Sequence, residues 1–150
     1  MVLTGLLDFA IAFVILLGMM AHYGIWPGLA MLAVPALLAV TVLTALGVSY
    51  WLSALDVEFR DVRYTLPFLT QLWMFATPVV YSSTLVPEAW RPLYGLNPMV
   101  GVIEGFRWAL LGTAPPDARM LAASLVTILT LCAGGVLYFR KMESTLADKI

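Results

Sequence analysis

The sequence has little charge: 11% of its 150 residues are Asp, Glu, Lys or Arg, against roughly 25% in a typical soluble domain. Hydrophobic residues make up 62% of the chain, which excludes an ordinary soluble fold. The formal net charge of −1 provides no basic face, so no nucleic-acid partner is expected. This composition is that of an integral membrane protein, with membrane lipids around it.

Cysteine and histidine are almost absent. Cys132 is the only cysteine and stands in an apolar run, which predicts a buried small side chain and excludes a disulfide framework or a metal-ligand cluster. The phosphate-binding G-x-x-x-x-G-K-[ST] loop is also missing, as are H-E-x-x-H and G-x-S-x-G. We therefore expect no catalytic residue, no metal and no cofactor in this chain, and we expect it not to be an enzyme.

Four segments have the roughly 20 apolar residues that a membrane-spanning helix needs. They predict an all-α membrane protein in which residues 1–150 form a single membrane domain with spans at about 2–23, 29–55, 64–81 and 120–139. The third segment is the shortest and contains Pro67 and Pro78, so we expect it to be bent. Two glycines and Pro27 predict a tight turn between the first two spans.

Positive charge indicates the orientation, because loops rich in Lys and Arg stay in the cytoplasm. With alternating spans, the loop at 55–63 and the C-terminal tail share one side, and they carry five of the eight basic residues: Arg60, Arg63, Arg140, Lys141 and Lys149. The opposite side carries Arg91, Arg107 and Arg119 over a longer region. The C-terminus is therefore predicted to be cytoplasmic.

The segment between the third and fourth spans is too apolar for an exposed loop, which predicts a pair of short re-entrant helices at about 87–94 and 98–111. Asn97 can cap the second helix, Pro98 suits its first position and Gly112 can end it. Such a helix is about 20 Å long, shorter than the bilayer core of about 30 Å.

Ionisable residues within the apolar segments can be interpreted in two ways. Glu104 and Arg107 are three apart and can pair, either lining a pathway or gate, or forming an ion pair of little energetic value at the interface. Asp8 is either a buried acid with a partner or a residue near the water surface. His22 follows an apolar run beside Tyr23, a grouping typical of the membrane interface rather than of a metal or catalytic site.

Two further groups of residues also have two readings. The first is the charged loop between the second and third spans, which is either a solvated hinge or a docking site for a soluble partner: Asp56, Glu58, Arg60, Asp61 and Arg63. The second is a set of aromatic side chains that either line a path for sugars or pack helices: Trp73, Phe75 and Tyr81.

The stretches FRDVRY, FATPVVY, LNPM and EGFRWALLG occur in this order along the chain. At this spacing they resemble the second half of ABC-2 type permeases that export polysaccharides such as O-antigen, capsule and teichoic acid. The resemblance extends over essentially all of the 150 residues.

This resemblance implies a multi-pass permease of the bacterial inner membrane that forms a homodimer, binds a separate cytoplasmic ATP-binding subunit and passes a lipid-linked glycan. ATP then belongs to the partner subunit. The short helices correspond to an outer gate, with Asn97, Pro98, Glu104, Arg107 and Trp108 as its residues. The aromatic set corresponds to the channel lining and the charged loop to an ATPase contact.

The family subunit has six spans where four are predicted here, so the resemblance also implies that this chain is the C-terminal part of such a subunit. Two alternatives remain open. One is an ABC-2 permease for another lipid or for a drug, and the other is a membrane fragment that does not transport.

Overall fold

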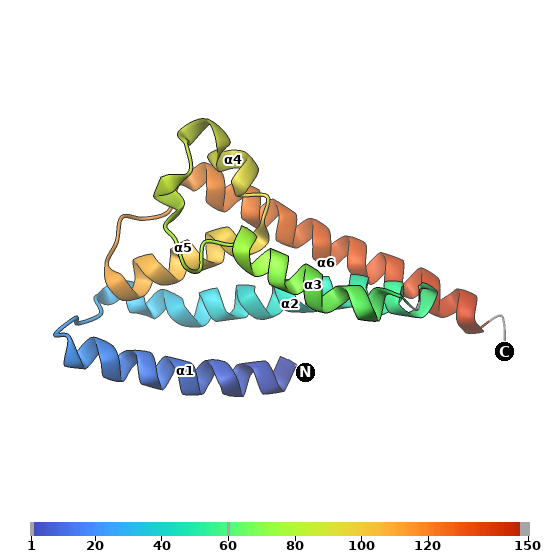
Figure 1. The fold of residues 1–150 in the computed structure, drawn as a ribbon, viewed down its shortest axis with the longest axis horizontal. Coiled ribbons are helices and arrows are strands. Elements are labelled where there is room, and N and C mark those ends of the chain that lie inside the picture. The colour runs from blue at the N-terminus through green and yellow to red at the C-terminus, as the bar shows by residue number, and fades with distance from the viewer. Residues whose placement is uncertain (1, 60, 148–150) are drawn as a thin grey trace.

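The computed structural model describes residues 2–59 and 61–147, and over these residues it consists of helices and connecting loops (Figure 1). The α-helices are α1 (Val2–His22), α2 (Val34–Glu58), α3 (Val62–Ala76), α4 (Arg91–Tyr94), α5 (Pro98–Leu111) and α6 (Ala118–Ala147). Short 3-10 turns lie at η1 (Leu29–Ala33), η2 (Ser83–Leu85) and η3 (Glu88–Trp90). The all-helical prediction is confirmed.

Within the described part of the chain, three helical stretches are long and apolar enough to cross a membrane: Leu3–His22, Leu29–Glu58 and Ala118–Met142. They correspond to the first, second and fourth predicted spans. The last begins two residues earlier than predicted because Asp117 precedes it and its Oδ1 accepts a hydrogen bond from the Arg119 amide at 2.8 Å.

The third predicted span, residues 64–81, is shorter in the structure. Its helix, α3, has 15 residues and ends at Ala76, so it spans about 22 Å and is not among the helices long enough to cross. The predicted end was wrong because Pro78 disfavours a helical conformation in the residue before it, and Thr77 is extended with φ −105° and ψ 139°. Pro67, by contrast, is accommodated inside the helix.

The predicted turn between α1 and α2 is confirmed. Gly24 has a left-handed φ of 70°, and the Ile25 amide donates to the Met20 carbonyl oxygen at 2.9 Å. This pairing satisfies a carbonyl at the end of α1, as in other glycine-terminated helices. The chain then reverses, so that α1 and α2 run antiparallel (Figure 1).

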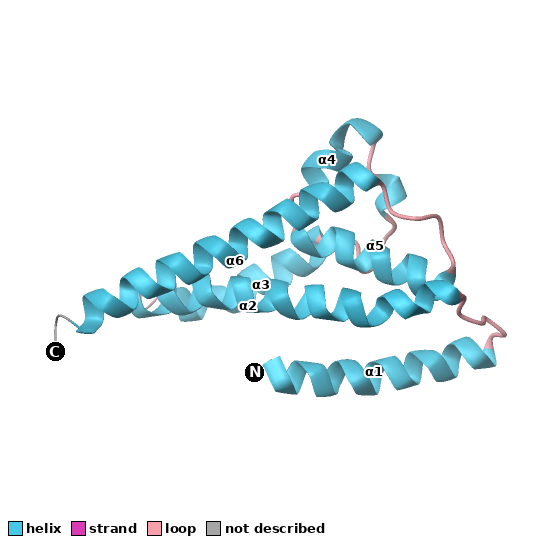
Figure 2. Ribbon diagram, turned by 180° about the vertical axis from the view of Figure 1, so that it is seen from behind, coloured by secondary structure: helices cyan, strands magenta, loops and turns pink. Residues whose placement is uncertain are grey.

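Small residues let α2 and α6 approach closely, and α6 converges on α2 toward its C-terminal end (Figure 2). A Cβ atom added to Gly47 would lie 3.2 Å from the Cys132 nitrogen, and one added to Gly135 would lie 2.9 Å from the Gly47 carbonyl oxygen. Such contacts are typical of helix pairs in membranes, where apolar burial from water gives no driving force. The Trp51 indole N–H also donates to the Leu131 carbonyl oxygen at 3.1 Å.

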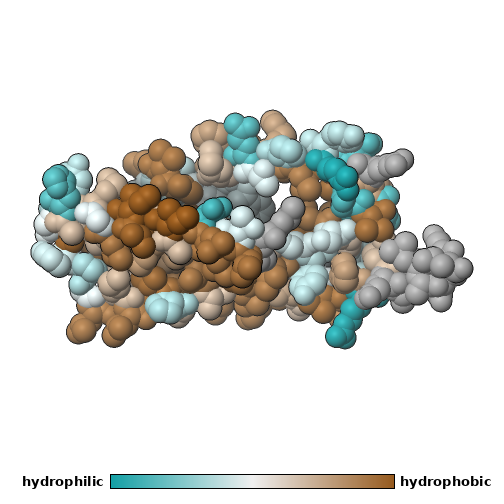
Figure 3. All heavy atoms as spheres, turned by 90° about the horizontal axis from the view of Figure 1, so that it is seen from below, coloured by the Kyte–Doolittle hydropathy of each residue, from teal (hydrophilic) through white to brown (hydrophobic). Residues whose placement is uncertain are grey.

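α5 packs against both α2 and α6. Its C-terminal end joins an apolar cluster formed by Met20, Val34, Ala109 and Leu110, which connects α1, the start of α2 and α5. Met20 is the one buried residue among the described side chains of α1, so this helix lies at the edge of the bundle. Hydrophobic residues gather over the middle of the face seen in Figure 3, as expected for a surface in contact with lipid.

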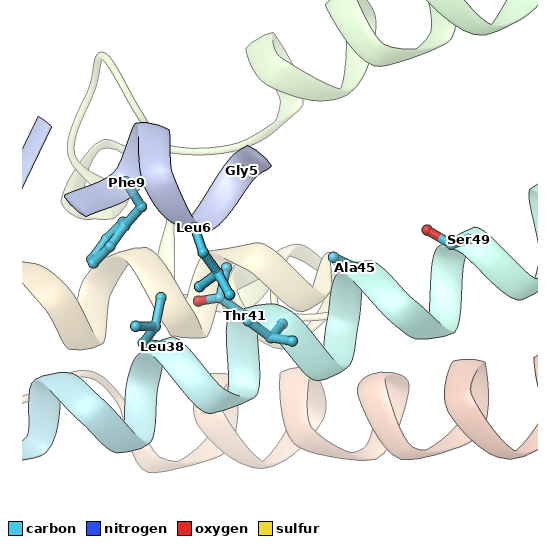
Figure 4. Close-up of a pocket in the computed structure, with 8 residues that line it drawn as sticks. Gly5, Leu6, Phe9, Leu38, Thr41, Ala45 and Ser49 are labelled. Carbon is cyan, nitrogen blue, oxygen red and sulfur yellow. The ribbon is translucent and has the colours of Figure 1, made fainter. Parts of the chain in front are cut away.

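An apolar groove of about 390 Å³ separates part of α1 from α2. Leu6 and Phe9 extend from α1 toward Leu38 and Thr41 of α2, as the close-up in Figure 4 shows. The groove contains none of the residues predicted for the site, and its lining carries hydroxyl groups but no charge.

Candidate functional site

The helix α5 has the caps that its sequence predicts. The Asn97 side chain accepts a hydrogen bond from the Met99 amide at 3.1 Å, Pro98 occupies the first turn, and Gly112 ends the helix in a left-handed conformation with φ 63°. The preceding short piece is a 3-10 turn followed by α4, beginning after Pro87. Both short helices therefore form, and α5 is about 21 Å long.

Glu104 and Arg107 form the ion pair that their spacing predicts, with 2.9 Å between Arg107 Nη1 and Glu104 Oε1. The two side chains are 14% and 24% exposed, so this is not a fully solvated surface pair. Arg107 also donates through Nη2 to the Val79 carbonyl oxygen at 3.2 Å, and Glu104 accepts a longer hydrogen bond of 3.4 Å from the Ser83 amide. The pair therefore holds the segment that follows α3 against α5.

A pair of tyrosine hydroxyls joins this connecting segment to α4. The hydroxyl oxygens of Tyr81 and Tyr94 are 2.6 Å apart, and the Tyr81 hydroxyl donates to the Phe75 carbonyl oxygen at 3.2 Å. Burial, the hydrogen bond with Tyr81 and the nearby Glu104 carboxylate raise the pKa of Tyr94 above its ordinary value, so it is neutral at physiological pH. Tyr81, predicted to line a channel, thus connects the end of α3 to α4.

The side-chain amide of Asn97 has a second role that its capping position does not predict. Its Nδ2 donates to the Ala76 carbonyl oxygen at 3.2 Å and to the Thr77 hydroxyl oxygen at 3.0 Å. Thr77 is buried, with 4% of its surface exposed. Asn97 therefore joins the start of α5 to the end of α3.

Ser124 of α6 is a connecting residue that sequence reasoning missed. Its hydroxyl is buried, donates to the Gly95 carbonyl oxygen at 2.9 Å and accepts from the Gly101 amide at 3.2 Å. A Cβ atom added to Gly101 would lie 2.9 Å from this same hydroxyl oxygen, so the glycine allows the close approach. The sequence did contain a signal for this contact: Ser124 is a small polar residue in an apolar helix and Gly101 is a glycine in another. Residues of these types often join helices in membranes.

The remaining gate and channel residues are spread over different surroundings. Trp73 and Phe75 lie on α3 with largely exposed side chains, and Tyr81 reaches Phe75 through the backbone carbonyl oxygen of that residue. Trp108 is half-buried and packs against the apolar cluster at the end of α5. These aromatic side chains stay predicted channel or gate residues.

The charged loop contains one ion pair among its described residues. Arg63 Nη2 lies 3.1 Å from Asp56 Oδ2, and the Glu58 carboxylate accepts a hydrogen bond of 2.6 Å from the Tyr138 hydroxyl of α6. Asp61 precedes α3 and is exposed. Two predicted residues, Arg60 and Lys149, fall outside the described residues.

The isolated polar residues of the spans, Asp8, His22 and Cys132, are exposed or half-buried. Asp8 lies on α1 and is exposed, and His22 is exposed with its ring edge-on to that of Tyr23 at 5.4 Å between centroids. Cys132 is half-buried rather than buried, and its thiol donates to the Leu43 carbonyl oxygen at 3.3 Å. Within the described part of the chain, no group of three or more His, Cys, Asp or Glu side chains gathers as a metal site would require.

The described residues form a helical chain with three stretches able to cross a membrane, and comparison with known proteins identifies the family. Residues 1–111 match the family described as "ABC-2 type transporter". The match extends over well more than half of the chain, which therefore belongs to the ABC-2 type transporter family.

The curated relatives include export permeases. The chain is 31% identical to the O-antigen export system permease protein RfbA of Myxococcus xanthus over 95% of this chain and 56% of that protein. It is 24% identical to a protein of the same description from Klebsiella pneumoniae over 95% of this chain and 55% of the relative. The inner membrane transport permease YadH of Escherichia coli strain K12 is 39% identical over 36% of this chain and 21% of that protein. The chain thus spans about half the length of the curated O-antigen relatives it matches.

Proposed function

We propose that this chain is part of the membrane permease of an ATP-driven exporter that carries a lipid-linked polysaccharide across the bacterial inner membrane. The observation that carries this proposal is 31% identity to an O-antigen export permease along 95% of the chain. The three apolar helical stretches long enough to cross a membrane support a membrane subunit.

The energy source is proposed to be a separate ATP-binding subunit, because the sequence lacks a phosphate-binding loop of its own. Its docking site is proposed at the charged loop around Asp56 and Arg63, on the cytoplasmic side. The loop between α2 and α3 lies at the same end of the bundle as the C-terminal end of α6, where the basic residues gather (Figures 1 and 2). A second copy of the permease completes the proposed pathway.

α4 and α5 are proposed as a re-entrant pair at the outer side of the membrane. Support comes from the length of α5, about 21 Å, and from its contacts with α2 and α6, which cover its apolar face. The pair formed by Glu104 and Arg107 connects this helix to the segment after α3, so it can hold an outer gate closed. An ion pair of this kind at membrane depth fits a functional position better than a solvated one.

The test is deletion of the encoding gene and its complementation, with surface polysaccharide and intracellular lipid-linked glycan measured in the same cells. The proposed function predicts loss of the surface glycan, accumulation of the intracellular intermediate and restoration of both by the intact gene. Unchanged amounts of both glycans in the deletion strain would overturn it, and this is also the result expected of a fragment that does not transport.

A second candidate is export of another lipid or of a drug. The relative YadH, 39% identical over 54 residues, is described as an inner membrane transport permease with no cargo in its description. Drug susceptibility and the lipid composition of the outer leaflet, measured on the same deletion strain, separate this candidate from polysaccharide export.

A further inference from the structure

The Asn97 side chain forms hydrogen bonds in two directions at the junction of α3 and α5. Its Oδ1 accepts from the Met99 amide, inside α5, whereas its Nδ2 donates to Ala76 and Thr77, at the end of α3. A residue that only caps a helix needs the oxygen alone, since Asp and Ser cap as well as Asn. The nitrogen therefore serves a purpose other than capping.

The surrounding donors and acceptors determine which amide atom faces α3. The Thr77 hydroxyl has one proton, which it donates to the Trp73 carbonyl oxygen at 2.7 Å, so its oxygen can only accept from Asn97. The Ala76 carbonyl oxygen is also an acceptor. A flipped amide would place oxygen against two acceptors and nitrogen against the Met99 N–H, which excludes that arrangement.

Few packing contacts hold α3 by other means. None of its residues from Val62 to Ala76 is buried, whereas the two residues that follow, Thr77 and Pro78, are buried. The polar contacts of Asn97, together with the Arg107 hydrogen bond to Val79, thus secure the C-terminal end of a helix whose body is exposed. α5 in turn is packed against α2 and α6.

We propose that Asn97 is a positioning residue whose Nδ2 keeps α5 in register with the end of α3, so that a displacement of α3 is passed to the outer pair of short helices. The inference rests on the proposed function only in giving this movement a role in export. The hydrogen-bonded junction itself is a property of the chain.

The experiment compares Asn97→Asp with the unaltered residue in the full chain, reconstituted in lipid nanodiscs. Asp keeps the capping oxygen but replaces the donor to α3 with a second acceptor. Spin labels at Leu72→Cys on α3 and Leu111→Cys at the end of α5, both exposed, report the distance between the two helices. Cys132→Ser, which keeps a donor to the Leu43 carbonyl, removes the native thiol in all samples.

We expect a single narrow distance for the unaltered junction. In Asn97→Asp a second, detached population should rise by about tenfold or more, because both hydrogen bonds that Nδ2 donates to the end of α3 are lost. Circular dichroism should show unchanged helix content, because the cap remains. Thr77→Val, which removes one acceptor, should give a smaller detached population, and Thr77→Ser, which keeps the hydroxyl, should restore the narrow distance.

A narrow, unshifted distance in both Asn97→Asp and Thr77→Val would overturn the proposal. If Asn97→Asp fails to insert, the contrast between Thr77→Val and Thr77→Ser decides the question alone. Export by the same variants, measured as the ratio of surface to intracellular glycan, should fall with the detached population. Absence of glycan export in the unaltered strain refutes the proposed function and leaves the distance result to decide the junction.

Discussion

Glu104 and Arg107 form an ion pair, and neutralising one of them has a different effect from neutralising the other. The difference lies in which polar group is left without a partner. Glu104→Gln keeps the acceptor oxygen, so it should lower the free energy of unfolding by about 1 kcal/mol. Arg107→Met leaves a carboxylate that is 14% exposed without its guanidinium and leaves the Val79 carbonyl without its donor, so the loss should be about 2 to 3 kcal/mol. Unfolding of the purified chain by SDS in mixed micelles measures both.

The matched control is Glu88→Gln, which removes a charge from the exposed pair with Arg91, whose charged atoms are 3.7 Å apart. An exposed pair contributes little, so this variant should unfold like the unaltered chain. Equal effects of Glu88→Gln and Arg107→Met would show that the inner pair is no more than a surface pair. The double variant Glu104→Gln with Arg107→Met should cost less than the two single effects added, because the two residues interact.

Local rules predicted much of the site at the level of single residues. Asn97, Pro98 and Gly112 follow from capping preferences, and the pairing of Glu104 with Arg107 follows from their spacing on a helix. The bond from Asn97 Nδ2 to α3 and the hydroxyl contacts of Ser124 were not predictable in this way. They join residues more than 19 positions apart in sequence, and the sequence of one helix does not state which other helix it meets.

The pair of helices α2 and α6 depends on the absence of a side chain at Gly135. A Cβ atom there would lie 2.9 Å from the Gly47 carbonyl oxygen and 3.0 Å from Trp51 Cδ1, so Gly135→Ala must push the helices apart. We expect it to lower the free energy of unfolding by about 1 to 3 kcal/mol despite the better helix propensity of Ala. The same SDS unfolding measurement applies.

Gly18→Ala is the control for helix propensity, because nothing lies within 4 Å of the added Cβ atom on α1. It should leave stability unchanged or raise it by about 0.5 to 1 kcal/mol. Stabilisation by Gly135→Ala of the same size as by Gly18→Ala would contradict the close packing of α2 and α6.

Helix positions could be predicted from apolar runs, but one helix end could not. The segment 64–81 is apolar throughout, which predicts a span, yet α3 ends at Ala76 because Thr77 precedes a proline and extends. Pro67, of the same residue type, sits inside the helix. Hydropathy does not distinguish Pro67 from Pro78. What distinguishes Pro78 is that the preceding residue, Thr77, is buried and accepts a hydrogen bond from Asn97.

The arrangement of the whole molecule follows from which helices find partners within it. α2, α5 and α6 pack on one another, whereas α1 and α3 leave most of their apolar surface uncovered by this chain. Composition predicted a membrane protein. It could not predict which helices pack inside the chain and which leave their apolar surface uncovered, since the long helices are all apolar. In a bilayer such uncovered faces are stable, because lipid tails are as apolar as leucine side chains.

Orientation across the membrane is a property of the whole chain, and two exposed positions report it. With Cys132→Ser as background, Asp61→Cys lies between α2 and α3, whereas Glu88→Cys lies in η3 beside α4. The charge distribution predicts that a membrane-impermeant maleimide added to intact spheroplasts labels Glu88→Cys, and that Asp61→Cys reacts only after permeabilisation. Full labelling of both after permeabilisation is the control for accessibility. Labelling of Asp61→Cys alone in intact spheroplasts would invert the orientation, place the charged loop outside and remove the proposed site for a cytoplasmic ATP-binding subunit.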